Sequence, residues 1–141
     1  MESTFENCVS LKSISLSGFT TYKVKSMNKL FKSTRLTSID LNIFNASNVV
    51  NMSFMFANSN SLESVNMANF ETNNVEDMSY FFYSCKSLTS VSLINLKSLK
   101  FGQFKIGDGN LQGTFKQCTS LISVDVSGFS TKYVTNMPEM F

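Results

Sequence analysis

The sequence contains no histidine and no tryptophan, only one proline, and no long run of apolar residues. The missing histidine removes the usual general base of enzymes, the usual pH-sensitive side chain and the most common metal ligand. Twelve Lys plus Arg against ten Asp plus Glu, with no basic run, argue against a nucleic-acid partner. No stretch reaches the roughly 20 apolar residues of a membrane span, and residues 1–8 lack signal-peptide features. We therefore expect no membrane insertion by this segment and no targeting signal within it.

The remaining residues form no recognisable catalytic arrangement. Without histidine, a serine nucleophile would need a buried lysine, and no motif places one. Asp40 and Asp125 are expected three repeat units apart, about 14 Å, whereas the carboxyl groups of a glycosidase pair lie about 5 to 9.5 Å apart. We therefore predict a non-enzymatic protein with no cofactor and no metal site.

What the sequence does contain is a repeated unit that reads Leu, any residue, Ser, Ile or Val, with Val, Met and Phe at fixed later positions. Self-similarity at intervals of 25 or 26 residues is typical of repeat architectures, and one longer interval of 33 residues carries an insertion. We therefore predict a single repeat array over residues 1–141. Its parts are a partial unit at 1–10, units at 11–35, 36–61, 62–87 and 88–120, and a partial unit at 121–141.

The insertion and the two chain ends leave alternatives open. Phe101 and Phe104, within the insertion at 97–110, either pack this loop against the body or form a local contact surface. The chain starts and stops inside a unit without a polar capping segment, which favours a piece of a longer protein. The alternative is a short protein whose uncapped ends are covered by end-to-end self-association.

Each unit is expected to contain a strand followed by a helix. Stretches such as LTSIDLN at 36–42 alternate apolar and polar residues, which predicts a short parallel strand. Met52, Met55 and Phe56 follow at i, i+3 and i+4, which predicts one or two helical turns. The expected fold class is a repeat solenoid, a leucine-rich-repeat-like array of about five strand and helix units. The residues expected to cap the helices are Ser26, Asn51, Asp77, Asn110 and Asn136.

The three cysteines, Cys8, Cys85 and Cys118, occupy the same position of their units. This position suits a small side chain, and a free cysteine behaves as a small hydrophobe. Cys85 and Cys118 are on adjacent units, whose spacing also fits a disulfide. The sequence therefore allows either buried thiols or one bridge.

Small polar residues are expected on the outer face of the strands, the surface that such arrays usually offer to partners. They would form a shallow hydrogen-bonding floor for a protein or a glycan, although serine also simply fits the close spacing of the strands. Candidates on this face are Ser13, Ser15, Ser38, Asp40, Ser64, Asn66, Ser90, Ser92, Ser123 and Asp125. Candidates at its rim are Lys12, Glu63, Tyr22, Lys132, Tyr133, Phe101 and Phe104.

Two units, LTSIDLNIFNASNVVNMSFMF at 36–56 and LESVNMANFETNNVEDMSYFFYSC at 62–85, resemble the BspA-type leucine-rich repeat. This is the 26-residue bacterial surface-protein repeat of mycoplasma lipoproteins. The resemblance implies a location at the cell surface or outside the cell, and binding to host matrix, cell surfaces or other proteins. It transfers no ligand residue, because the shared residues are apolar core positions. We therefore expect a protein- or glycan-binding module of a longer cell-surface adhesion protein, or alternatively a structural stalk or spacer.

Overall fold

The described part of the chain contains four short strands. A computed structural model describes residues 1–70, 72–94, 111–128, 134 and 137–141. The strands within these residues are β1 (Ser38–Asp40), β2 (Ser64–Asn66), β3 (Ser90–Ser92) and β4 (Ser123–Asp125). β1 pairs with β2, and β3 pairs with β4, in two parallel two-stranded sheets. Each strand lies near the start of a unit, where the sequence predicts one. The unit at 11–35 is also expected to begin with a strand, over 11–17, and none is formed there.

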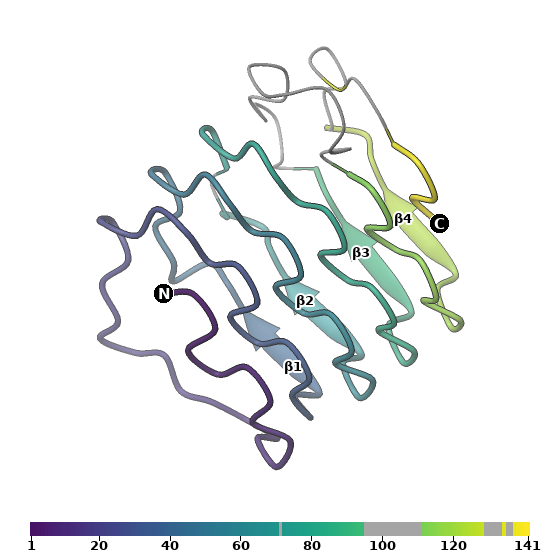
Figure 1. The fold of residues 1–141 in the computed structure, drawn as a ribbon, viewed down its shortest axis with the longest axis horizontal. Helices are drawn as coiled ribbons and strands as arrows, with labels where there is room; N and C mark the ends of the chain where they lie inside the picture. Colours follow the sequence, from purple (N-terminus) through teal and green to yellow (C-terminus); the bar gives the residue numbers. More distant parts are fainter. Residues whose placement is uncertain (71, 95–110, 129–133, 135–136) are drawn as a thin grey trace.

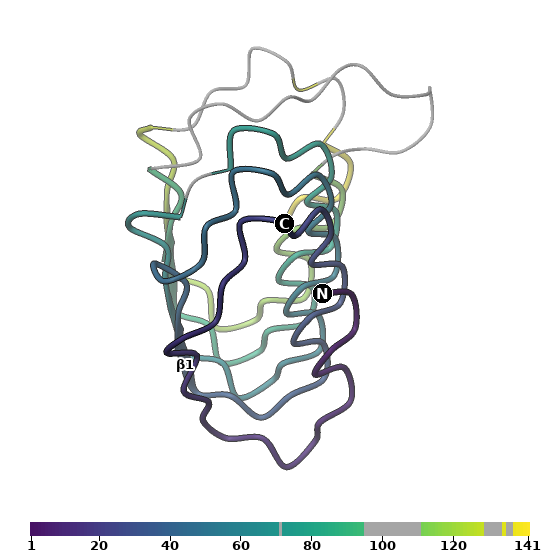
Figure 2. The ribbon, with the colours of Figure 1, turned by 90° about the vertical axis from the view of Figure 1, so that its left-hand side faces the viewer.

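The chain passes repeatedly between two opposite walls. The strands lie side by side in chain order (Figure 1), and in the side view they occupy one wall while tight turns occupy the other (Figure 2). We call these the strand wall and the turn wall, and each passage around both walls a rung. The turn wall comprises residues 1–8, 26–34, 51–59, 77–85, 111–118 and 137–141.

The turn wall contains no helix in the part of the chain that the structure describes. Its amides alternate between two uses: Phe56 donates to the Phe81 carbonyl of the next rung at 2.9 Å, whereas Ala57 donates to the Phe54 carbonyl at 3.1 Å. In an α-helix every interior amide would donate to the carbonyl four residues earlier. The expected leucine-rich-repeat-like solenoid of strand and helix units is therefore wrong.

Left-handed backbone at every fourth residue breaks the helix. Phe54 and Asn58 have φ angles of 57° and 61°, and the same two positions recur in the neighbouring rungs. Such a φ angle cannot occur inside a right-handed helix, and it costs roughly 1–2 kcal/mol for most residues other than glycine. The turn-wall residues with positive φ are Ser3, Asn7, Lys29, Ser33, Phe54, Asn58, Tyr80, Ser84, Gly113, Gln117 and Glu139.

The sequence misleads here because a four-residue turn period resembles the 3.6-residue period of a helix. The expected caps do accept a hydrogen bond, but from the residue two positions later and within a turn. Asn51 Oδ1 accepts from the Ser53 amide at 2.8 Å, and Asp77 Oδ1 accepts from the Ser79 amide at 2.8 Å. Ser26 Oγ accepts from the Asn28 amide in the same way, at 3.3 Å. Asn110 and Asn136 lie outside the described residues.

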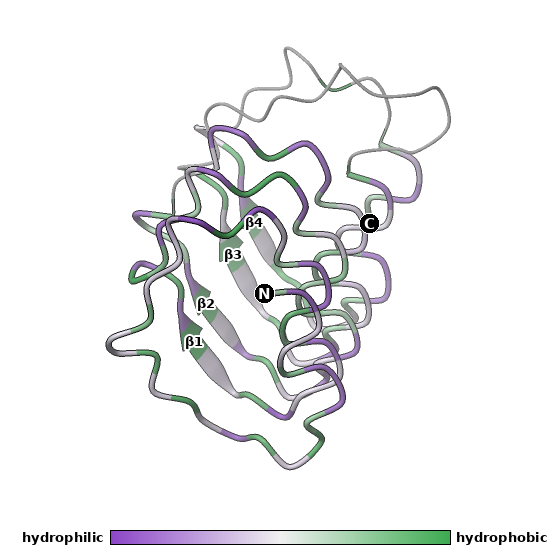
Figure 3. Ribbon diagram, turned by 60° about the vertical axis from the view of Figure 1, so that its left-hand side comes forward, coloured by the Kyte–Doolittle hydropathy of each residue, from purple (hydrophilic) through white to green (hydrophobic). Residues whose placement is uncertain are grey.

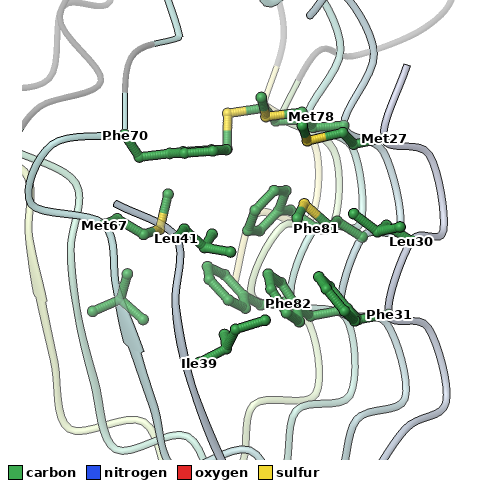
Figure 4. Close-up of a cluster of buried hydrophobic side chains, with 14 of the residues drawn as sticks. Met27, Leu30, Phe31, Ile39, Leu41, Met67, Phe70, Met78, Phe81 and Phe82 are labelled. Atoms are coloured by element: carbon green, nitrogen blue, oxygen red, sulfur yellow. The ribbon is translucent and has the colours of Figure 1, made fainter. Parts of the chain in front are cut away.

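The core lies between the two walls. Ile39, Leu41 and Met67 of the strand wall face aromatic and aliphatic side chains of the turn wall (Figure 4), and hydropathy alternates along each rung (Figure 3). One phenylalanine per rung stacks on the next with ring centroids 5.3 to 5.7 Å apart. This ring column consists of Phe5, Phe31, Phe56, Phe82, Phe115 and Phe141.

The residues with left-handed backbone allow a prediction about stability. Gln117 is exposed and has a φ angle of 64°, so Gln117→Gly is expected to raise the free energy of unfolding by about 0.5–1 kcal/mol, because glycine tolerates this conformation. Chemical denaturation of the two proteins measures the change. Gln112→Gly, at a turn-wall position without positive φ, is the matched control and should destabilise; equal losses in both variants would contradict the assigned backbone.

Candidate binding surface

The strand face predicted from the sequence exists as an exposed surface. The first and third residues of each strand are exposed, and the middle residue is buried or half-buried. Parallel register aligns Ser38 with Ser64 and Asp40 with Asn66, and it aligns Ser90 with Ser123 and Ser92 with Asp125. Ser13 and Ser15 are also exposed, beside β1 but outside any strand. The structure therefore brings together eight of the ten candidates on β1 to β4.

The side chains at the strand ends are used by the fold. Asp40, Asn66 and Asp125 each accept, through Oδ1, a hydrogen bond from the amide two residues later, at 2.9, 3.2 and 3.0 Å. The Ser127 amide and side chain, with a further hydrogen bond from Ser92, hold the pKa of the Asp125 carboxyl below its ordinary value. Asp125 therefore stabilises the turn above its unfolded-state pKa, and this contribution is lost as the pH falls through the lowered folded-state value.

The serines at the strand starts are not used in this way. Within the described residues, the hydroxyl groups of Ser38, Ser64, Ser90 and Ser123 have no hydrogen-bond partner, and all four residues are exposed. By contrast, Ser15 contacts Ser17 at 3.2 Å and Ser92 donates to Asp125 at 3.3 Å. We call Ser38, Ser64, Ser90 and Ser123 the strand-start serines. Their hydroxyl groups form a row on the surface and make no hydrogen bond within the described residues.

The rim is only partly described. Lys12, Glu63 and Tyr22 are exposed, and Lys23 Nζ lies 5.5 Å from the centroid of the Tyr22 ring. The other rim candidates, Lys132, Tyr133, Phe101 and Phe104, lie outside the described residues, as does the insertion at 97–110.

Sequence reasoning missed an apolar side chain at the rim. Ile122 precedes β4 and is 86% exposed. It occupies the unit position held by Lys12, Glu63 and Thr89 in other rungs, so an isoleucine among polar residues was the available signal. Ile122 therefore leaves an apolar side chain exposed at this end of the strand face.

The cysteines are free in this structure. Cys85 is buried, Cys118 is half-buried and Cys8 is exposed.

The described residues hold no group of three or more Cys, Asp or Glu side chains arranged to bind a metal ion. Nor does any helix in them have the length and apolarity needed to cross a membrane.

Comparison with known proteins places the chain in a family. The family model described as "Mycoplasma protein of unknown function, DUF285" matches residues 1–105 and 109–141. The expected membership of the BspA-type leucine-rich repeat family is therefore wrong. The surface location and the adhesive role were implied by that resemblance, and the resemblance no longer supports them. A search of curated proteins and a search of solved structures each found no match. Because the matched segments span almost all 141 residues, the chain belongs to the DUF285 family of Mycoplasma proteins.

Proposed function

We propose that this chain is a non-catalytic binding module that holds a protein or glycan partner on its strand face. The observation that carries the proposal is the row of strand-start serines, whose hydroxyls are exposed and have no partner within the described chain. Small polar side chains of the turn wall, such as Thr34 and Ser59, instead donate to the backbone and lie inside the fold. The hydroxyls of the exposed row are therefore open to hydrogen bonding with a partner, and this supports the proposal.

The chemistry of the surface favours a partner rich in hydrogen-bonding groups. The serines are short and stand on parallel strands about 4.8 Å apart, so they form a flat floor and not a pocket. A hydroxyl both donates and accepts, which suits glycan hydroxyls and peptide groups equally. One carboxylate oxygen of Asp40 and one of Asp125 already accept a hydrogen bond from a turn amide. These two residues therefore add mainly negative charge to the floor.

A structural spacer is the second candidate function. The ring column runs through every rung from Phe5 to Phe141, and backbone hydrogen bonds join successive rungs along the turn wall. Such continuous packing gives a stiff body that would hold other segments apart. A spacer, unlike a binding module, needs no partner on the strand face.

A charge-insertion experiment tests the binding proposal. The double variant Ser64→Arg and Ser90→Arg places two long cations over the centre of the strand face. The wild-type chain and the variant are each applied to a glycan array and to a displayed random-peptide library. We expect saturable binding by the wild type. The variant should lose affinity at least about tenfold, or about 1.4 kcal/mol, because the two arginine side chains occupy the space of the partner.

A matched control separates position from charge. Asn60→Arg and Thr119→Arg add the same charge at an exposed unit position that Arg35 and Lys86 occupy naturally in other rungs. This control should retain binding, and circular dichroism should show that both variants are folded. Unchanged binding by the strand-face variant would refute the strand face as the site. An absence of saturable binding to every probe by the wild type would favour the spacer.

A further inference from the structure

One position of the rung brings side chains of neighbouring rungs into direct contact. It lies three residues after a ring of the ring column and is occupied in successive rungs by Cys8, Thr34, Ser59, Cys85 and Cys118. Thr34 Oγ1 and Ser59 Oγ lie 3.2 Å apart, and each also donates to the Phe31 carbonyl. The γ atoms of these two adjacent members of the column are therefore in direct contact.

Cys85 and Cys118 continue the column in the next two rungs. Cys85 Sγ donates to the Phe56 carbonyl at 3.1 Å, and Cys118 Sγ donates to the Phe82 carbonyl at 3.0 Å. The amide of Cys85 donates to that same Phe82 oxygen, also at 3.0 Å. The sulfur of Cys118 and the backbone of Cys85 thus meet at one atom, which places the two cysteines side by side.

The two thiols differ in access. Cys85 has no exposed surface, whereas Cys118 is half-buried. Burial raises the pKa of both thiols, and the neighbouring Cys118 raises that of Cys85 further. A small oxidant therefore reaches Cys118 first, and both thiols react faster as the pH rises toward their pKa values.

We propose that Cys85 and Cys118 are an oxidation site, at which a peroxide joins the two thiols in a disulfide. In the first step a peroxide oxygen is transferred to Cys118 Sγ, which becomes a sulfenic acid while the rest of the peroxide leaves as an alcohol or water. Cys85 Sγ then attacks that sulfur, the S–S bond forms, and the sulfenic oxygen leaves as water with the thiol proton. The two cysteines lose two electrons and the peroxide gains them.

The bridge would link two rungs that share no strand ladder. β2 lies in the rung of Cys85 and β3 in the rung of Cys118, and these strands belong to separate sheets. A disulfide would join the rungs covalently and close the intervening segment, residues 86–117, into a loop. Loop closure restricts the unfolded chain and so favours the folded state. This inference is independent of the proposed function of the strand face.

Peptide mapping tests the site on the whole chain. Reduced protein is treated with hydrogen peroxide at about pH 8, denatured, alkylated and digested with trypsin, which separates Cys8, Cys85 and Cys118 into peptides 1–12, 36–86 and 117–132. We expect peptides 36–86 and 117–132 to be linked within one chain. The apparent melting temperature should rise by at least about 5 °C after oxidation.

Variants keep the test specific. Cys8→Ser should leave the crosslink unchanged, and Cys118→Ser should abolish it. The double variant Ser59→Cys and Cys118→Ser moves the thiol pair one rung along the same column, where both positions are fully buried, so it should stay reduced under the same treatment. Alkylation of both Cys85 and Cys118 after peroxide treatment, or equal crosslinking of Cys85 to Cys8, would overturn the proposal.

Discussion

Phe82→Ala should lower the free energy of unfolding by about 3–5 kcal/mol, because it removes a fully buried ring from a close-packed core. Phe82 stacks on Phe56 and Phe115 with centroids 5.7 and 5.6 Å away, and it meets the Phe81 ring edge-on at 4.6 Å. Removing it leaves a cavity with rings on three sides, which the turn wall cannot close without breaking its backbone hydrogen bonds. Chemical denaturation followed by circular dichroism measures the loss.

The same column provides the control. Phe141 stacks on Phe115 at 5.6 Å, but it is 72% exposed. Phe141→Ala therefore removes a contact without opening a cavity, and a loss of about 1 kcal/mol or less is expected. If Phe82→Ala also cost less than about 1 kcal/mol, the ring column would not be the centre of the core.

Those rings also show which part of the fold the sequence could predict. A phenylalanine that recurs once per unit, such as Phe56 and Phe82, had to occupy one repeated environment, and burial followed from its apolar character. The strand at 38–40 was predictable in the same way, since Ile39 and Leu41 alternate with polar residues. These features depend on side-chain polarity, which the sequence states directly.

The turn wall depends instead on the sign of the φ angle, which the sequence does not state. Lys29, Phe54 and Tyr80 all adopt left-handed backbone, although only glycine and asparagine commonly signal it. Gly113 is the one turn-wall position where glycine occurs, and a Cβ there would lie 2.5 Å from the Tyr80 ring. Most left-handed positions of the turn wall hold residues other than glycine, so the sequence does not mark them. A four-residue turn repeat and a short helix then give the same apolar pattern.

For the candidate surface, exposure was predictable but the use of each polar group was not. Alternation along β1 and β4 already placed Asp40 and Asp125 on the outer face. Their hydrogen bonds to the amides of Asn42 and Ser127 depend on how the chain bends after the strand. An aspartate followed two residues later by Asn or Ser is compatible with such a turn, yet it is equally compatible with a free carboxylate. The structure therefore moves the emphasis from the carboxylates to the strand-start serines.

Gly128→Ala is expected to cost about 2–3 kcal/mol, because the added methyl group has no space. A Cβ built on Gly128 would lie 1.9 Å from the Ile94 carbonyl oxygen and 2.7 Å from its carbon. These are backbone atoms of the preceding rung, so they cannot swing aside as a side chain can. Relief requires the rungs of β3 and β4 to separate, which would strain the bond from the Leu93 amide to the Asp125 carbonyl at 2.8 Å. Denaturation gives the free energy, and hydrogen exchange at the Leu93 amide reports the local opening.

Gly18 offers a matched control within the same tripeptide. Ser17, Gly18 and Phe19 repeat the sequence of Ser127, Gly128 and Phe129, but a Cβ on Gly18 would meet nothing within 4 Å. Its φ angle of 85° means that Gly18→Ala should cost about 1 kcal/mol through backbone strain alone. Exchange at Leu93 should accelerate in the Gly128 variant and stay unchanged in the Gly18 variant. Because the two substitutions are chemically identical, a difference between them measures the close approach of neighbouring rungs, and an unchanged Leu93 amide in both would contradict it.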